Sequence, residues 1–143
     1  MKKKMVSFVM AALLLLTVNV TAFASTAPAN SSVASGIHIL LVNTDDAKAT
    51  LSFSGTRAGC SGVVDGKSGT TKITATALLK RVSSNGTTTV KTWSGLSTTS
   101  ESLYFDSSYY VASGYTYELE IDAKVYRNGT VESISVSDTD YCG

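Results

Sequence analysis

The sequence predicts an all-β protein: a two-sheet antiparallel sandwich of seven or eight short strands, preceded by a signal-peptide helix. Apolar and polar residues alternate with a period of two, as in strands that bury only one face. Two Asn-Gly pairs are typical of hairpin turns, and no stretch after residue 24 keeps helical spacing over the length of a helix. Because each sheet must bury its apolar face, we expect two sheets packed against each other.

Residues 1–24 have the three parts of a cleavable signal peptide. Lysines 2–4 form a basic start, residues 5–18 carry no charge, and the small-residue pattern Ala22-Phe23-Ala24 closes the segment. The apolar stretch is shorter than a membrane-spanning helix requires. We therefore expect cleavage after Ala24, with Ala27 as the alternative, and a secreted product that does not stay in the membrane.

The remaining chain is long enough for one domain with one core. Residues 25–35 are small and polar and contain the only proline, so we interpret them as a flexible leader. The sandwich domain is predicted over residues 36–143.

The first half of this domain contains four predicted strands. An apolar run at residues 37–42 is the first, and the following strands alternate between apolar and polar positions. Clusters of Asn, Asp, Gly and Ser at residues 43–46 and 65–69 indicate turns. The strands are predicted at residues 37–42, 47–53, 57–64 and 71–82.

The second half is organised as hairpins. Asn85-Gly86 and Asn128-Gly129 are predicted turns, because both residue types tolerate a positive φ. The segment 106–114 is predicted to be a loop that carries two adjacent tyrosines. Residues 115–125 have the clearest alternation in the chain, with apolar side chains at every odd position. The strands are predicted at residues 87–94, 99–105, 115–125 and 130–136.

The segment 111–121, Val-Ala-Ser-Gly-Tyr-Thr-Tyr-Glu-Leu-Glu-Ile, resembles the sixth strand of fibronectin type III and related immunoglobulin-like domains. The resemblance implies an immunoglobulin-like sandwich in which Tyr117 is the tyrosine-corner residue, its hydroxyl bonded to upstream backbone. Tyr115 is the alternative holder of that role. The mature chain is also similar to small secreted proteins of Gram-positive, gut-type bacteria that have no known function, which implies location and fold but no activity.

The two cysteines are predicted to form a disulfide, because an even number of cysteines in an exported protein is typical of one. A Cys60–Cys142 bond would close a loop of about 80 residues, which the chain-entropy model values at roughly 4–5 kcal/mol. Two buried free thiols are the alternative. The immunoglobulin pattern differs, because there the second cysteine follows the corner tyrosine by two residues, where this chain has Leu119.

Composition argues against several classes of function. The only histidine, His38, lies in an apolar run, and the carboxylates Glu118, Glu120 and Asp122 fit a solvated strand face, so we predict neither catalytic residues nor an enzyme. No ligand spacing predicts a metal or a cofactor. Residues 25–143 contain nine Lys and Arg and eleven Asp and Glu, which gives a net charge of −2. They contain no cluster of basic residues, so we predict no binding to nucleic acid or to a membrane.

Aromatic residues give the most useful functional prediction. Trp93, Tyr104, Tyr109 and Tyr110 are candidate ligand-binding residues, because flat rings on a sandwich surface bind proteins or sugars at low entropic cost. The alternative is that tyrosine simply favours half-buried strand positions. We expect an extracellular binding module for a protein or a glycan. A secreted effector, such as a bacteriocin-like toxin or a regulator of another exported protein, is the alternative function.

Overall fold

The computed structural model describes residues 41–143. The predictions of a signal peptide, a leader and strand residues 37–40, as well as His38, lie outside the described residues. Leu41, the first described residue, precedes the first strand rather than belonging to it. Within the described range there is no helix long and apolar enough to cross a membrane.

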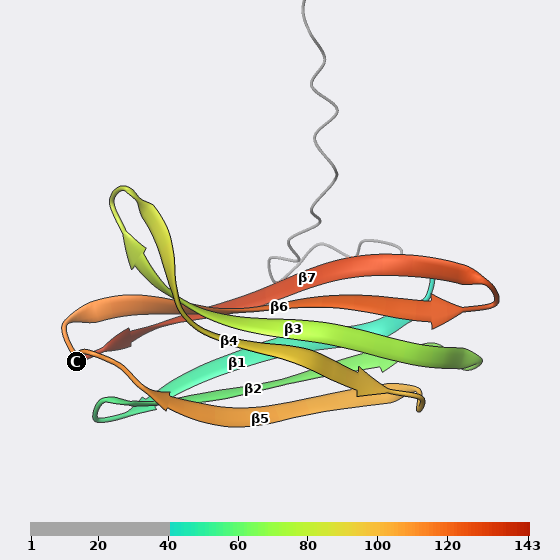
Figure 1. Ribbon diagram of the computed structural model, residues 1–143, viewed down its shortest axis with the longest axis horizontal. Coiled ribbons are helices and arrows are strands. Elements are labelled where there is room, and N and C mark those ends of the chain that lie inside the picture. Colours follow the sequence, from blue (N-terminus) through green and yellow to red (C-terminus); the bar gives the residue numbers. More distant parts are fainter. Residues whose placement is uncertain (1–40) are drawn as a thin grey trace, which may run out of the picture.

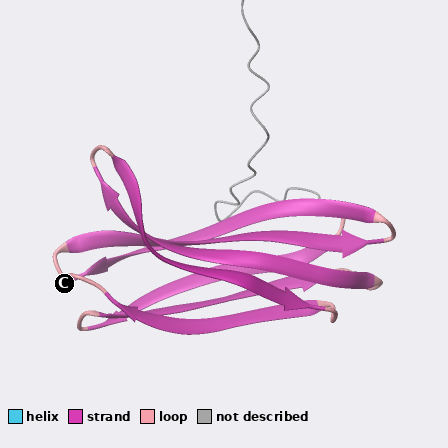
Figure 2. Ribbon diagram, in the orientation of Figure 1, coloured by secondary structure: helices cyan, strands magenta, loops and turns pink. Residues whose placement is uncertain are grey.

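The described chain is a sandwich of two antiparallel sheets (Figures 1 and 2). One sheet has three strands in the order β1-β2-β5, and the other has four in the order β4-β3-β6-β7. The all-β, two-sheet prediction is therefore confirmed. The strands are β1 (Thr44–Ser54), β2 (Arg57–Gly66), β3 (Thr70–Ser83), β4 (Gly86–Thr98), β5 (Ser102–Tyr110), β6 (Tyr115–Arg127) and β7 (Thr130–Cys142).

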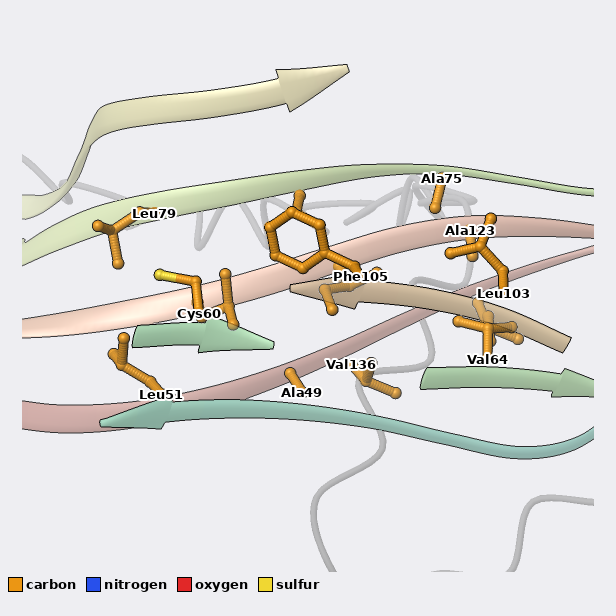
Figure 3. Packing of buried hydrophobic residues seen from close by; sticks show 14 of the residues in the cluster. Ala49, Leu51, Cys60, Val64, Ala75, Leu79, Leu103, Phe105, Ala123 and Val136 are labelled. Carbon is orange, nitrogen blue, oxygen red and sulfur yellow. The ribbon is translucent and has the colours of Figure 1, made fainter. Parts of the chain in front are cut away.

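The core lies between the sheets and consists of the inward residues of alternating strands. On β6 the five odd-numbered residues from 117 to 125 are at most 3% exposed. They pack with the inward residues of the other strands, which Figure 3 shows from close by. Other members of this core are Leu51, Val64, Ile73, Leu79, Leu103, Phe105, Ile134 and Val136.

Gly62 allows the two sheets to approach closely. A Cβ atom at this position of β2 would lie 2.2 Å from Cδ1 of Ile121 on β6 and 2.8 Å from the carbonyl oxygen of Lys48 on β1. Both distances are shorter than real contacts, so any side chain would force the strands apart. The glycine therefore helps to set the distance between β2 and β6.

The two Asn-Gly pairs form turns in different ways. Asn128 and Gly129 both have positive φ values, 50° and 74°, and are the two loop residues between β6 and β7, as predicted. In the β3–β4 hairpin, Ser83 pairs with Gly86, so the two loop residues are Ser84 and Asn85. This turn is thus shifted by one residue from the predicted Asn85-Gly86. Gly86, which follows the two loop residues, has a positive φ, whereas Asn85 does not.

Several strand boundaries differ from the prediction. β1 begins at Thr44 instead of following a turn at 43–46, and β7 continues to Cys142. Tyr109 and Tyr110 lie in β5, so the predicted loop at 106–114 is mostly strand. Long-range pairing explains the last two differences: all of β5 pairs with β2, and all of β7 pairs with β6.

The start of β1 is held by a carboxylate from the other sheet. Glu132 of β7 accepts hydrogen bonds from the backbone N–H groups of Val42, Asn43 and Thr44 and from the Thr44 hydroxyl, at 2.7–2.9 Å. Burial raises the pKa of Glu132, but these four hydrogen bonds outweigh burial and hold its pKa below the ordinary value. The carboxylate therefore binds the start of β1 to the other sheet more strongly when it is ionised than when it is protonated.

Tyr117 is buried, and its hydroxyl donates a 2.9 Å hydrogen bond to the carbonyl oxygen of Ala112, five residues upstream. This is the contact that the tyrosine-corner interpretation requires. Its ring packs against Phe53 of the other sheet, with ring centroids 5.7 Å apart. Burial raises the pKa of the Tyr117 hydroxyl, which keeps its proton available for the bond.

We expect Tyr117→Phe to lower the free energy of unfolding by about 0.5–1.5 kcal/mol, because it removes one hydrogen bond and keeps the packed ring. Urea denaturation at neutral pH measures the change. Tyr110→Phe is the matched control, since Tyr110 is 73% exposed, and its stability should stay within about 0.5 kcal/mol of the parent. Equal losses in both variants would contradict a structural role for the Tyr117 hydroxyl.

We also expect Glu132 to contribute stability that depends on pH. Because its folded-state pKa is lowered from 4.5, the contribution is fully present above that value and is lost as the pH falls through the folded-state pKa. Glu132→Gln should cost about 1–3 kcal/mol at neutral pH and much less in acid. Denaturation at about pH 7 and about pH 3 measures both. If the free energies of unfolding of Glu132→Gln and the parent differed by the same amount at both pH values, the role of the carboxylate would be refuted. Glu118→Gln is the control.

Candidate functional site

The four candidate aromatics all lie on or beside β5, but they fall into two groups. Tyr104 and Tyr110 project from the outer face of the three-stranded sheet and are 77% and 73% exposed. They are six positions apart along the strand, roughly 20 Å. Tyr109 and Trp93 lie at the seam where β5 meets β4. The structure therefore does not bring all four residues into one site.

Two polar residues of β5 lie between the exposed tyrosines on the same face. In the antiparallel register with β2, Asp106 is opposite Ser61 and Ser108 is opposite Gly59. Tyr110 is opposite Arg57, whose guanidinium donates to the Ser108 hydroxyl from Nε at 3.2 Å and from a terminal nitrogen at 3.0 Å. The outer face thus offers a carboxylate, a guanidinium and several hydroxyls between two aromatic rings.

A depression of about 320 Å³ lies on this face. Gly59 is part of its lining, and a Cβ atom at this position would lie 3.1 Å from the Ser52 hydroxyl oxygen. The polar side chains of this face that line it come from all three strands: Ser52, Ser54, Arg57, Ser61, Asp106 and Ser108. We call this surface, together with Tyr104 and Tyr110, the β5 face.

The seam aromatics are held by contacts within the protein. Trp93 packs edge-on against Phe105, with ring centroids 5.3 Å apart, and it is half-buried. The Lys91 ammonium lies 5.8 Å from the Trp93 ring centroid and 5.6 Å from that of Tyr109. These contacts close the β4–β5 side of the core. Trp93 and Tyr109 therefore have structural contacts that Tyr104 and Tyr110 lack.

The predicted disulfide is not formed, because both cysteines are free and buried. The thiol of Cys142 lies 3.5 Å from the carbonyl oxygen of Gly55 in the β1–β2 turn. Cys60 lies further into β2, three residues beyond Arg57, which is roughly 10 Å of strand. Cys60 is opposite Leu51 on β1 and Ser107 on β5, so the two cysteines contact different segments of the chain.

Cys60 is the described thiol whose pKa is shifted. Burial, with the Asp106 carboxylate nearby, raises the pKa of the Cys60 thiol to about 11, so the thiol stays protonated and weakly nucleophilic at neutral pH. Residues 41–143 contain no cluster of three or more His, Cys, Asp or Glu side chains that could hold a metal ion.

The residues between the two tyrosines were missed from the sequence. The sequence predicts a loop at Asp106 and Ser108, and Arg57 and Gly59 belong to a strand about 50 residues earlier in the chain. The even positions 104–110 of β5, Tyr, Asp, Ser and Tyr, are a pattern that could have indicated one polar and aromatic strand face. The contribution of β2 depends on register, which the sequence alone does not specify.

No family model matches the chain, and no curated protein matches it. Among solved structures, the solution structure of CsgH from R. palustris is similar at a TM-score of 0.40 and 13% identity. The match covers 64% of this chain and 87% of that chain. A likeness at this level carries no argument about function.

We expect both thiols to be alkylated only after unfolding. Iodoacetamide in denaturant, without reductant, should add two carbamidomethyl groups to the protein, whereas the native protein should react slowly because both sulfurs are buried and the Cys60 pKa is raised. Intact-mass spectrometry measures both reactions. A denatured protein that stays unmodified until it is reduced would contradict the free-thiol structure.

Proposed function

We propose that this protein is a secreted carbohydrate-binding module that binds a glycan chain along the β5 face. Export rests on the signal-peptide pattern of residues 1–24. The observation that carries the binding proposal is the placement of Tyr104 and Tyr110, which flank a hydroxyl-lined depression on one sheet face. We propose binding without catalysis, since the chain has a single histidine and both of its thiols are buried.

The chemistry of the β5 face supports a sugar ligand. The apolar face of a sugar ring stacks on an exposed aromatic ring, and its hydroxyls need both donors and acceptors. Tyr104 and Tyr110 supply the rings, Asp106 supplies an acceptor, and the serines supply both functions. The separation of the tyrosines along one strand suits an extended chain better than a single small molecule.

We also propose that the sandwich is immunoglobulin-like. The hydrogen bond from Tyr117 to Ala112 supports this assignment, as does the division of seven strands into sheets of three and four. Such a fold presents strand faces and end loops as binding surfaces, but it does not specify a ligand. The ligand is therefore argued only from the residues of the β5 face.

We expect Tyr104→Ala and Tyr110→Ala each to weaken glycan binding at least tenfold, because aromatic side chains that a ligand covers on binding dominate binding energies. An array of bacterial, plant and mucin glycans identifies the ligand, and titration calorimetry measures its affinity. Tyr141→Ala is the matched control, since Tyr141 is 59% exposed on β7 of the other sheet and should leave the affinity unchanged.

Two results would overturn the proposal. One is a wild-type protein that binds no glycan, or only a protein partner. The other is a loss of affinity in Tyr141→Ala equal to the loss in the two β5 variants.

A further inference from the structure

A second, larger concavity lies on the opposite side of the molecule. It is a groove of about 800 Å³ along the outer face of the four-stranded sheet, and all four strands line it. Its volume falls within the range of small-molecule pockets, roughly 300–1,000 Å³. The polar side chains of the lining are Lys72, Thr74, Thr76, Ser97, Glu120, Asp122, Lys124, Tyr126, Ser133 and Ser135.

The groove lies beside an irregularity in the sheet. The β3–β4 register shifts between Ala75 and Ala77, and Gly95 on β4 has a positive φ of 76°. A Cβ atom at Gly95 would meet nothing within 4 Å, so the backbone conformation explains this glycine, not crowding. In Figure 1 the end of the β3–β4 hairpin that carries the turn bends away from the sandwich. The irregularity thus distinguishes this region from a flat sheet face.

The centre of the groove is an ordered array of hydroxyls around one acid and one amine. Asp122 is opposite Thr76 on β3 and Ser135 on β7, and Lys124 is opposite Thr74 and Ser133. Neither Asp122 nor Lys124 forms a salt bridge to another described residue, whereas Glu120 is bonded to Lys80 at 2.5 Å. The Asp122 carboxylate and the Lys124 ammonium are therefore both available to a ligand, beside hydroxyls of the two strands that flank β6.

An aromatic ring lies at one end of this array. Tyr126 follows Lys124 by two residues on the same face of β6, and the Lys72 ammonium lies 5.7 Å from its ring centroid. The ring is partly exposed. A sugar ring could stack on Tyr126 while its hydroxyls form hydrogen bonds with Lys124 and Thr74.

We propose that this groove is a second binding site, independent of the β5 face, for a neutral, polyhydroxylated ligand: a short stretch of a neutral glycan. The lining has two lysines and two acids, so its formal charges cancel, and an acidic or basic polymer gains no net attraction. Ligand hydroxyls donate to the Asp122 carboxylate and accept from the Lys124 ammonium. Serine and threonine hydroxyls provide both functions.

A consequence follows if both faces bind glycans. The β5 face and the groove lie on the two outer surfaces of one sandwich, so a single domain would bridge two chains, or bind two parts of one polymer with increased avidity. The groove proposal does not depend on the β5 face, and each site can fail without the other.

The test is a ¹⁵N NMR titration of the full mature chain with neutral gluco-, galacto- and mannooligosaccharides, with an oligogalacturonide as the acidic comparison. We expect saturable shifts at the amides of Thr74, Thr76, Asp122 and Ser135 with at least one neutral probe. Asp122→Ala should weaken this binding at least tenfold, because it removes the charged acceptor. The matched control is Glu118→Ala, which changes an acid on the same face of β6 that does not line the groove.

Each outcome decides the proposal. Groove shifts that weaken in Asp122→Ala, persist in Glu118→Ala and persist in a Tyr104→Ala, Tyr110→Ala double variant support a separate site. Shifts confined to the β5 face would overturn the groove while supporting the proposed function. The absence of groove shifts with every neutral probe, groove binding of the acidic probe alone, or equal affinity in Asp122→Ala would also overturn it. Asp122 is exposed, and the ¹⁵N spectrum of the variant verifies its fold.

Discussion

The structure depends on the burial of one face of β6. Tyr117, Leu119, Ile121, Ala123 and Val125 all point inward, and none is more than 3% exposed. β6 pairs with β3 on one side and β7 on the other, so its inward residues lie along the middle of the four-stranded sheet. The three-stranded sheet covers this apolar strip, and the hydrophobic gain from covering it holds the sandwich together.

The same alternation determines what the outer faces offer. Every residue between two inward positions of β6 points to solvent, which places Glu120, Asp122 and Lys124 in the groove. On β5, inward Leu103 and Phe105 leave Tyr104 and Asp106 on the opposite surface. The polar side chains of both proposed sites therefore lie on strands whose inward residues are packed in the core.

The fold could be predicted from the sequence because its signals are local. Two-residue alternation and Asn-Gly pairs act within a few residues, and they correctly predicted an all-β sandwich and the turn at Asn128-Gly129. The sites could not be predicted, because they depend on register between distant strands. Asp106 opposite Ser61, and Asp122 opposite Thr76, are pairings across about 45 residues of chain. The four hydrogen bonds to Glu132 span 88–90 residues.

The cysteines show the same limit most clearly. An even number of cysteines in an exported chain is a statement about compartment, whereas a disulfide also requires two strand positions to meet. Cys60 is central in β2, beside Leu51 and Ser107, while Cys142 ends β7 and lies against the β1–β2 turn. Each thiol instead fills a place in the core, where a small apolar side chain is sufficient. Noncovalent contacts therefore join the end of β7 to the first hairpin: the Cys142 thiol lies on the Gly55 carbonyl oxygen, and the Asp138 carboxylate accepts a hydrogen bond from the Leu51 N–H at 2.8 Å.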